Sequence, residues 1–343
     1  MLPATHPPRP CLPRAEPPRA ARQFAWPKAR SLALALLVGA SAAGRAEPLA
    51  YITNQGDHSV SVLDLATQKV RATIAVGKSP AGVVAVARAG KVFVTTPGDN
   101  SVSVIDMREE RTVATLAAGA GAVGIAASPD GRRVYVADWF GRQLLGFDTA
   151  SHREVLRVAL GQAPAGVAVS QDGRTVYVAE RDDDSVAVVD VRSARVRQRI
   201  AVGRHPFALL VDAPRRRLYA LNVLSDDVSA IDLESGRTLA TVKVGKAPYG
   251  AALADGGRRL YITNQHDGSV SVIDPATLQT VQTLSGFAYP EGVAAHGERV
   301  LVVNWMDDNV SLLNAASGRL LGTVATGSNP RGFGAFIGEP VPK

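Results

Sequence analysis

Short runs in which apolar and polar residues alternate fill the chain from Leu49 to its end. One stretch, residues 166–202, shows the pattern well. Its β-rich runs lie at 166–170, 175–179, 186–189 and 195–202, separated by the turn sequence Gln-Asp-Gly-Arg, a polar loop and a second turn. Alternation over four to eight residues, bounded by turn residues, is typical of half-buried strands. The pattern predicts four short antiparallel strands in this stretch.

The same pattern recurs seven times along the chain. Its second strand begins at Tyr51, Phe93, Tyr135, Tyr177, Tyr219, Tyr261 and Leu301, so that the first six units start 42 residues apart and the last step is 40. Four-stranded units repeated at this interval are typical of a β-propeller blade. We therefore predict an all-β fold, a seven-bladed β-propeller of four-stranded antiparallel blades.

The two ends of the repeat array predict how the ring closes. The first unit begins at a second strand, near Tyr51, whereas residues 332–337 at the end of the chain match a first strand. The C-terminal strand would then complete the blade that the N-terminal repeat begins. Such pairing leaves no open sheet edge.

Residues 1–46 have the composition of a leader. Lys28 and Arg30 precede an apolar run at 32–38, and small residues follow as far as Ala46. This order is typical of a secretory signal peptide, and the apolar run is too short for a permanent membrane span. We predict cleavage after Ala46, with Ala43 as the alternative, and a single propeller domain at 47–343. The predicted location is the periplasm, with a secreted or cell-surface protein as the alternative.

The charge of the chain lies mainly in this leader. The whole sequence has 38 basic and 31 acidic residues, of which the leader holds seven and one, so residues 47–343 hold 31 and 30 and carry a net charge of +1. This balance argues against nucleic acid as a partner. The only cysteine is Cys11, in the leader. The remaining chain therefore has no disulfide, thiolate metal site or attached c-type haem.

The repeat resembles that of a known family. Tyr51-Ile-Thr-Asn54 is followed by Ser59-Val-Ser-Val-Leu-Asp64, and Ser269-Val-Ser-Val-Ile-Asp274 repeats the latter motif. These motifs resemble the YVTN-repeat family of β-propellers along the whole of residues 47–343. The resemblance implies an exported seven-bladed scaffold. Some members of the family are connected with quinoprotein oxidation systems, and others with DNA binding.

Three rows of repeated residues are interpreted as structural. The first is a row of acids at the end of the third strand, namely Asp64, Asp106, Asp148, Asp190, Asp232 and Asp274. Such side chains accept N–H groups in turns. The second row, at the end of the second strand, is Asn54, Thr96, Asp138, Glu180, Asn222, Asn264 and Asn304. Its alternative role is a calcium site. The third is the glycine that begins the innermost strands, at 82, 124, 166, 250, 292 and 332, with Ala208 in the remaining blade, where backbones crowd.

One position departs from the sevenfold pattern. The residue before this glycine is Ala81, Val123 and Ala165 in blades two to four, but Phe207, Tyr249, Glu291 and Arg331 in blades five, six, seven and one. A scaffold role would be shared by all blades, so the difference indicates a site. The loops after the second strands share this face and add Trp139, His266 and Trp305. These seven residues form the predicted binding site. We predict no catalytic residues, no metal and no cofactor.

Three functions remain open at this point. The first is a non-enzymatic scaffold that binds an unidentified exported protein or small ligand on this face, accessory to a quinoprotein-type oxidation system as the resemblance implies. The second is an enzyme, either an oxidoreductase component or a metal-dependent lactonase using Glu291, Asp138, Glu180 and His266. The third, implied by the resemblance alone, is DNA binding. Of the three, the asymmetry of the face favours the first.

Overall fold

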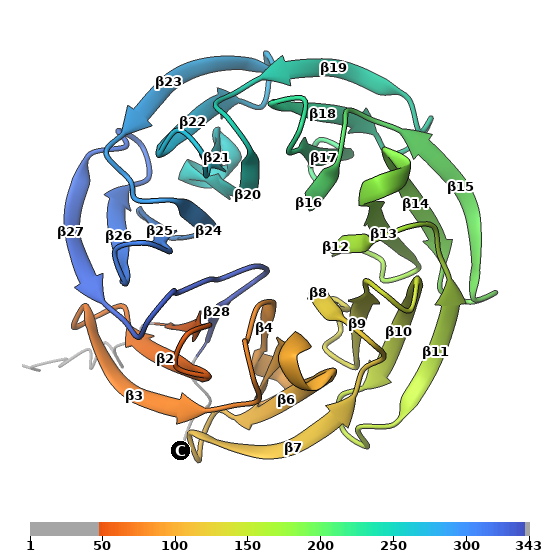
Figure 1. The fold of residues 1–343 in the computed structure, drawn as a ribbon. Helices are drawn as coiled ribbons and strands as arrows, with labels where there is room; N and C mark the ends of the chain where they lie inside the picture. Colours follow the sequence, from red (N-terminus) through yellow and green to blue (C-terminus); the bar gives the residue numbers. More distant parts are fainter. Residues whose placement is uncertain (1–47, 340–343) are drawn as a thin grey trace, which may run out of the picture. The chain divides into compact units, whose positions relative to one another are not determined.

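The computed structural model describes residues 48–339, which form a ring of seven four-stranded antiparallel sheets (Figure 1). The predicted leader and its cleavage site lie outside the described residues. From the axis outwards, the blades are β28 (Ile337–Gly338), β1 (Leu49–Asn54), β2 (Ser59–Asp64), β3 (Lys69–Ala75); β4 (Val83–Val86), β5 (Lys91–Thr96), β6 (Ser101–Asp106), β7 (Arg111–Ala117); β8 (Ala122–Ala127), β9 (Arg133–Asp138), β10 (Gln143–Asp148), β11 (Glu154–Ala159); β12 (Pro164–Val169), β13 (Thr175–Glu180), β14 (Ser185–Asp190), β15 (Arg195–Ala201); β16 (Pro206–Asp212), β17 (Arg217–Asn222), β18 (Asp227–Asp232), β19 (Thr238–Lys243); β20 (Pro248–Ala254), β21 (Arg259–Asn264), β22 (Ser269–Asp274), β23 (Gln279–Ser285); and β24 (Pro290–His296), β25 (Arg299–Asn304), β26 (Asn309–Asn314), β27 (Leu320–Ala325).

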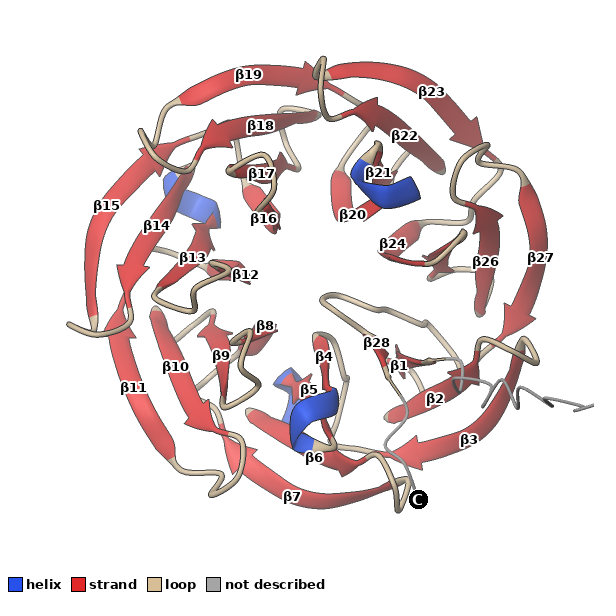
Figure 2. Ribbon diagram, turned by 180° about the vertical axis from the view of Figure 1, so that it is seen from behind, coloured by secondary structure: helices blue, strands red, loops and turns tan. Residues whose placement is uncertain are grey.

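The predicted seven-bladed propeller is thus confirmed. Four short 3₁₀ helices interrupt the turns of the described part, η1 (Ala87–Ala89), η2 (Pro97–Asp99), η3 (Arg181–Asp183) and η4 (Asp255–Gly257) (Figure 2). Within residues 48–339 no helix is long and apolar enough to cross a membrane.

The core lies between neighbouring blades. The second and third strands of each blade are buried along nearly their whole length, and the outermost strands alternate between exposed and covered residues. The aromatic residue of the second strand is central to this packing, because Tyr51, Tyr135 and Tyr219 are at most 1% exposed. A strand covered on both faces needs apolar residues at successive positions. This explains the near-continuous apolar second strands.

The C-terminal segment closes the ring, as predicted, but not as a regular strand. It pairs with β1 at Ala50↔Ile337 and again at Asn54↔Pro330. Between these two pairs the C-terminal segment advances by seven residues and β1 by four. The three extra residues of the C-terminal segment bulge toward the axis. The carbonyl of Phe333 accepts from the backbone N–H of Val83, in the next blade, at 2.9 Å. The predicted strand at 332–337 is consequently reduced to β28.

Glycine is required where the innermost strands approach one another. A Cβ added to Gly124 would lie 2.0 Å from the carbonyl oxygen of Ala165, and one on Gly166 would lie 2.2 Å from that of Phe207. No larger residue fits against a backbone at that distance. The structural interpretation of this row is confirmed.

The repeated aspartates cap turns. Asp148 Oδ1 accepts from the backbone N–H of Ser151 at 2.7 Å and from its hydroxyl at 2.8 Å. These two bonds hold the pKa of Asp148 below its usual value, because they stabilise the charged carboxylate. Asp64 accepts from Thr67 N–H in the same way, at 3.0 Å. The row therefore shapes the β-turns, as predicted.

Candidate functional site

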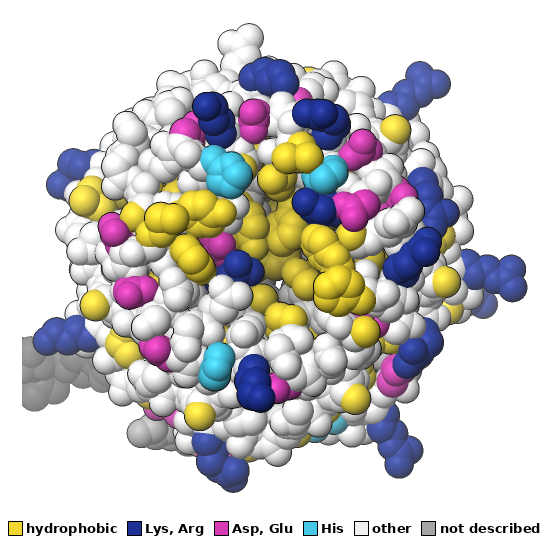
Figure 3. All heavy atoms as spheres, in the orientation of Figure 1, with side chains coloured by type: hydrophobic (Ala, Val, Ile, Leu, Met, Phe, Trp, Pro, Cys, Tyr) yellow, Lys and Arg dark blue, Asp and Glu magenta, His cyan; other side chains and the backbone are white. Residues whose placement is uncertain are grey.

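The predicted site residues share one face of the ring, which we call the upper face. It consists of the loops that follow the second strand of each blade and the loops that lead into the first strand. Backbone hydrogen bonds join the two sets of loops, for example from Trp305 N–H to the Tyr289 carbonyl at 3.2 Å and from Trp139 N–H to the Gly121 carbonyl at 2.8 Å. The face drawn in Figure 3 has hydrophobic side chains gathered around its hollowed centre, with a basic and an acidic side chain among them and most other charged side chains farther out.

Aromatic rings from blades five, six and one meet at the centre of the upper face. The rings of Phe207 and Tyr249 stack with their centroids 4.6 Å apart. Phe333 packs against both, at 4.8 Å from Phe207 and 5.7 Å from Tyr249. Trp139 extends the group from blade three, 6.4 Å from Phe207. The sequence analysis did not select Phe333, because only the bulge in the C-terminal segment carries its ring across the axis.

A buried ion pair lies beside these rings. Arg331 Nε is 3.2 Å from Glu291 Oε2, and Gln265 Nε2 donates to Glu291 Oε1 at 3.0 Å. Arg331 Nη1 also donates to the Tyr249 hydroxyl at 3.5 Å. The geometry between Arg331 Nε and Glu291 Oε2 falls short of a hydrogen bond, and neither atom has a hydrogen-bond partner among residues 48–339. Native proteins rarely leave buried charged atoms in this state.

Burial controls the ionisation of this pair. Glu291 is 1% exposed, and burial raises the pKa of its carboxyl to about 7, against the lowering effects of the Arg331 charge and the Gln265 hydrogen bond. Burial also raises the pKa of the Tyr249 hydroxyl, and the negative charge of Glu291 adds to this effect. Glu291 therefore titrates near neutral pH.

A second aromatic group lies next to the ion pair. Tyr289 packs between His266 and Trp305, with centroid distances of 5.8 and 5.5 Å. Trp305 Nε1 donates to Gln55 Oε1 at 3.3 Å. Thus the seven predicted residues fall into two groups on one face. Trp139, Phe207, Tyr249, Glu291 and Arg331 form the first, with Phe333, and His266 and Trp305 form the second through Tyr289.

The residues of the two groups are less accessible than those at the rim of the hollow. Tyr249 is 7% exposed, whereas Phe140 and Met306, in the loops after the second strands, are 74% and 61% exposed. Glu291 and Arg331 belong to the predicted binding site. The structure places Glu291, which is 1% exposed, beneath the floor of the hollow and leaves the Arg331 side chain 23% exposed. A small ligand or a projecting group of a larger partner would therefore reach Arg331 rather than Glu291. A large flat surface would meet the rim alone.

The side chains of the second row of polar residues form hydrogen bonds within their own blades. Asn264 Nδ2 donates to Ser269 and Ser271 hydroxyls at 2.9 and 3.0 Å, and Asp138 accepts from the Ala120 and Gly141 N–H groups. Glu180 accepts from Arg199 and from the backbone of the preceding loop. Among residues 48–339, no three His, Cys, Asp or Glu side chains gather where they could hold a metal ion. The carboxylates of Asp138 and Glu180 are thus bonded within the blades, whereas the side-chain oxygens of Asn222, Asn264 and Asn304 have no hydrogen-bond partner among the described residues.

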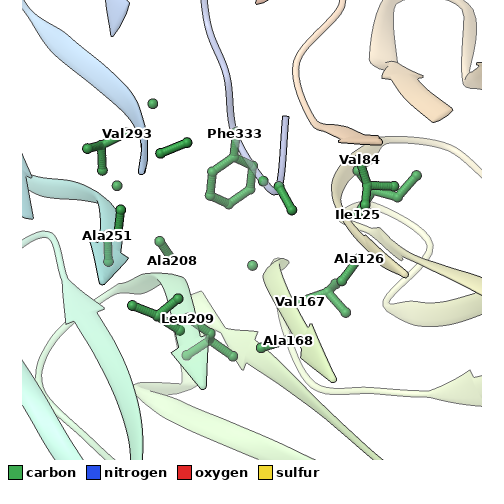
Figure 4. Close-up of a pocket in the computed structure, with 18 of the residues that line it drawn as sticks. Val84, Ile125, Ala126, Val167, Ala168, Ala208, Leu209, Ala251, Val293 and Phe333 are labelled. Atoms are coloured by element: carbon green, nitrogen blue, oxygen red, sulfur yellow. The ribbon is translucent and has the colours of Figure 1, made fainter. Parts of the chain in front are cut away.

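An axial cavity of about 570 Å³ is lined by the innermost strands β4, β8, β12, β16, β20 and β24 and by residues 332–335 of the C-terminal segment. In Figure 4, the side chains of Val167, Leu209 and Ala251 surround its open centre and the ring of Phe333 projects into it. The other lining residues are also glycine, alanine or larger apolar residues. The upper-face site therefore has charged groups beside an apolar channel.

Two family models match parts of the chain, one described as a YNCE-like β-propeller at residues 85–174 and one as a lactonase, 7-bladed β-propeller, at residues 148–250. Both describe β-propellers, and neither is named for the YVTN repeat. No curated protein matches the chain.

Solved structures with the same fold include three with low sequence identity. Hydrazine synthase of Kuenenia stuttgartiensis has 22% identity and a TM-score of 0.70, covering 78% of this chain and 92% of its own. The dihydro-heme d1 dehydrogenase NirN, in complex with DHE, has 17% identity and a TM-score of 0.65, covering 83% and 74%. A functionally unknown protein from Desulfotomaculum acetoxidans has 13% identity and a TM-score of 0.72, covering 86% and 99%. Identities this low support the fold alone.

Proposed function

We propose that the protein is an exported, non-enzymatic β-propeller that binds a small ligand, or a projecting group of a partner protein, in the hollow at the centre of its upper face. The observation that carries this proposal is the Glu291–Arg331 pair, which is buried without complete hydrogen bonding beside three packed aromatic rings. A ligand that accepts a hydrogen bond from Arg331, whose side chain is 23% exposed, would be favoured there. Aromatic walls around a few polar groups are typical of ligand sites.

The leader pattern supports export to the periplasm, and the repeat resemblance supports a role accessory to an oxidation system there. One protein of similar fold is named as a dehydrogenase. In this proposal the oxidising enzyme is a separate protein that the propeller serves, because the residues gathered in the hollow are suited to binding.

Replacing both Phe207 and Trp139 by alanine is expected to weaken capture of the ligand or partner from a periplasmic extract by at least about tenfold, because interface aromatics contribute most of the binding energy. Both side chains are half-buried, so more of their surface is accessible than that of Tyr249. The measurement is affinity capture by residues 47–343, with identification by mass spectrometry.

The matched control for this experiment is Leu239→Ala with Val281→Ala, which removes exposed apolar side chains from the outer strands β19 and β23. Equal capture by the two double variants, at equal melting temperature, would reject the hollow as the binding site.

A hydrolase is the second candidate function. It is favoured by the lactonase match over residues 148–250 and by the Glu291 carboxyl, whose pKa near 7 suits a general base. Asp138 and Glu180, the other acids considered for this role, are fully buried and bonded within the blades. Lactone turnover by the purified protein, lost in Glu291→Gln and measured with and without added calcium, would favour the enzyme over the binding protein.

A further inference from the structure

The Arg331 side chain is held in a fixed position and is still accessible. Its backbone N–H donates to the Thr53 carbonyl in blade one at 2.7 Å. From there the side chain reaches two other blades, with Nε 3.2 Å from Glu291 Oε2 and Nη1 donating to the Tyr249 hydroxyl at 3.5 Å. The side chain is nevertheless 23% exposed. A guanidinium held on two sides loses little freedom when a ligand binds to it.

The accessible edge of this guanidinium opens into the hollow of the upper face. Arg331 Nε is buried and Nη1 faces Tyr249, whereas Nη2 forms no hydrogen bond with any residue of the described part of the chain. Arg331 does not line the axial cavity. Figure 3 shows a basic side chain among the hydrophobic ones at the hollowed centre. A ligand in the hollow would therefore meet Nη2.

The charges around this nitrogen favour an anion. Arginine only donates hydrogen bonds, and an ionised acceptor forms a bond about twice as strong as a neutral one. Glu291 offsets the Arg331 charge incompletely, because burial raises the pKa of its carboxyl to about 7. Arg181, the cation that lies over the Trp139 ring, is already paired with Asp182 at 2.6 Å. A single guanidinium, partly offset in this way, suits a singly charged anion such as a carboxylate.

The walls of the hollow favour an aromatic body beside that anion. The ring of Phe207 stacks on Tyr249, whose hydroxyl faces Arg331. Phe207 and Trp139 are half-buried, so their rings remain partly accessible next to the guanidinium. A ring joined to a carboxylate could thus pack on Phe207 while its charge meets Arg331. Aromatic pairs of this kind gain more than the burial of their surface alone.

We propose that the hollow binds a carboxylate joined to an aromatic ring, with the carboxylate on Arg331 Nη2 and the ring against Phe207. This inference rests on the proposed function and names the ligand class of the same hollow. Two sources supply this chemistry, a free aromatic acid and the C-terminal residue of a protein that ends in an aromatic amino acid.

Isothermal titration calorimetry on the purified protein tests this inference with two matched pairs of probes. The first pair is benzoate and benzamide, which share their shape and differ in charge. The second is acetyl-glycyl-phenylalanine with a free or an amidated C-terminus. The acid is expected to bind at least tenfold more tightly than the amide in one of the pairs, and that pair identifies the source. Equal affinities of acid and amide in both pairs, or no binding of either acid, overturn the inference.

Arg331→Gln is expected to abolish the preference for the acid, and Arg319→Gln, at an exposed position, is its control. Both are measured at pH 5.5, below the pKa of Glu291, where no buried carboxylate is left unpaired. Arg331→Lys, which keeps the charge and lacks the planar guanidinium, is a second variant and is expected to lower the preference at least threefold. A preference that persists unchanged in both Arg331 variants overturns the inference.

These outcomes are separable from the proposed function. Capture that depends on Phe207 and Trp139 would stand even if acids and amides bound equally, and the hollow would then be a binding site for another class of ligand.

Discussion

Arg331→Ala is expected to lower the free energy of unfolding by about 3 kcal/mol at pH 8, because it leaves the Glu291 carboxylate buried without a counter-charge. The Glu291 side chain is 2% exposed and the Arg331 side chain 23%, so solvent screens the pair little. The loss is expected to be much smaller at pH 5.5. At that pH, below the pKa of about 7, the carboxyl is protonated in the parent as well as in the variant, so Arg331→Ala leaves no buried carboxylate unpaired.

The sign of this pH dependence follows from the direction of the pKa shift. The pKa of Glu291 in the folded protein, about 7, is raised above its ordinary value of 4.5. The folded state then binds a proton more tightly than the unfolded state, so this group's contribution to stability is present below pH 4.5 and is lost as the pH rises through 7. The Arg331 charge lowers the pKa of Glu291, so removing Arg331 raises this pKa further. The pH range over which the contribution is lost then becomes wider.

Urea unfolding of the parent, of Arg331→Ala and of Arg319→Ala at the two pH values measures this effect. Arg319 is exposed at the turn between β26 and β27 and provides a charge-matched control. An equal loss for Arg331→Ala at both pH values would show that Glu291 does not titrate in this range.

Tyr249→Ala is expected to lower the free energy of unfolding by about 3 kcal/mol, because it removes a ring that is 7% exposed and packs on Phe207 and Phe333. The sequence alone places Tyr249 in the predicted binding site. In the structure its ring is also part of a buried cluster.

Tyr249→Phe separates the ring from its hydroxyl. It keeps the stack on Phe207 and loses only the 3.5 Å contact with Arg331, so its cost is expected to be below about 1 kcal/mol. Chemical denaturation of both variants gives the comparison. If the phenylalanine variant were as unstable as the alanine variant, the hydrogen bond rather than the ring would hold the site together.

The sequence pattern predicted the ring of blades well, because each blade repeats the same local signals. Turn aspartates such as Asp148, the tight glycines and the buried second strands depend on neighbours within one blade or the next. The break of symmetry from Phe207 to Arg331 was also visible, since it required only a comparison of equivalent positions. Local patterns repeated seven times therefore determine most of the architecture.

The depth and composition of the site were not visible in the sequence. Phe333 reaches the centre through a bulge three residues long, which depends on pairing between the last segment and blade two. Gln265 follows the asparagine of its blade and reaches Glu291 in the next one. Both contacts join residues of different blades. Periodicity within a blade cannot specify them, nor can it show that Glu291 and Arg331 face each other below the rim.

Hydrogen exchange of residues 47–343, with and without the captured ligand or partner, tests the central claim most directly, because it locates binding on the molecule. The account predicts protection of amides in the loops at 138–143, 204–208, 288–292 and 304–308, which surround the hollow of the upper face. Protection confined to the turns of the opposite face, such as 128–133 and 171–174, or to the outermost strands, would contradict it.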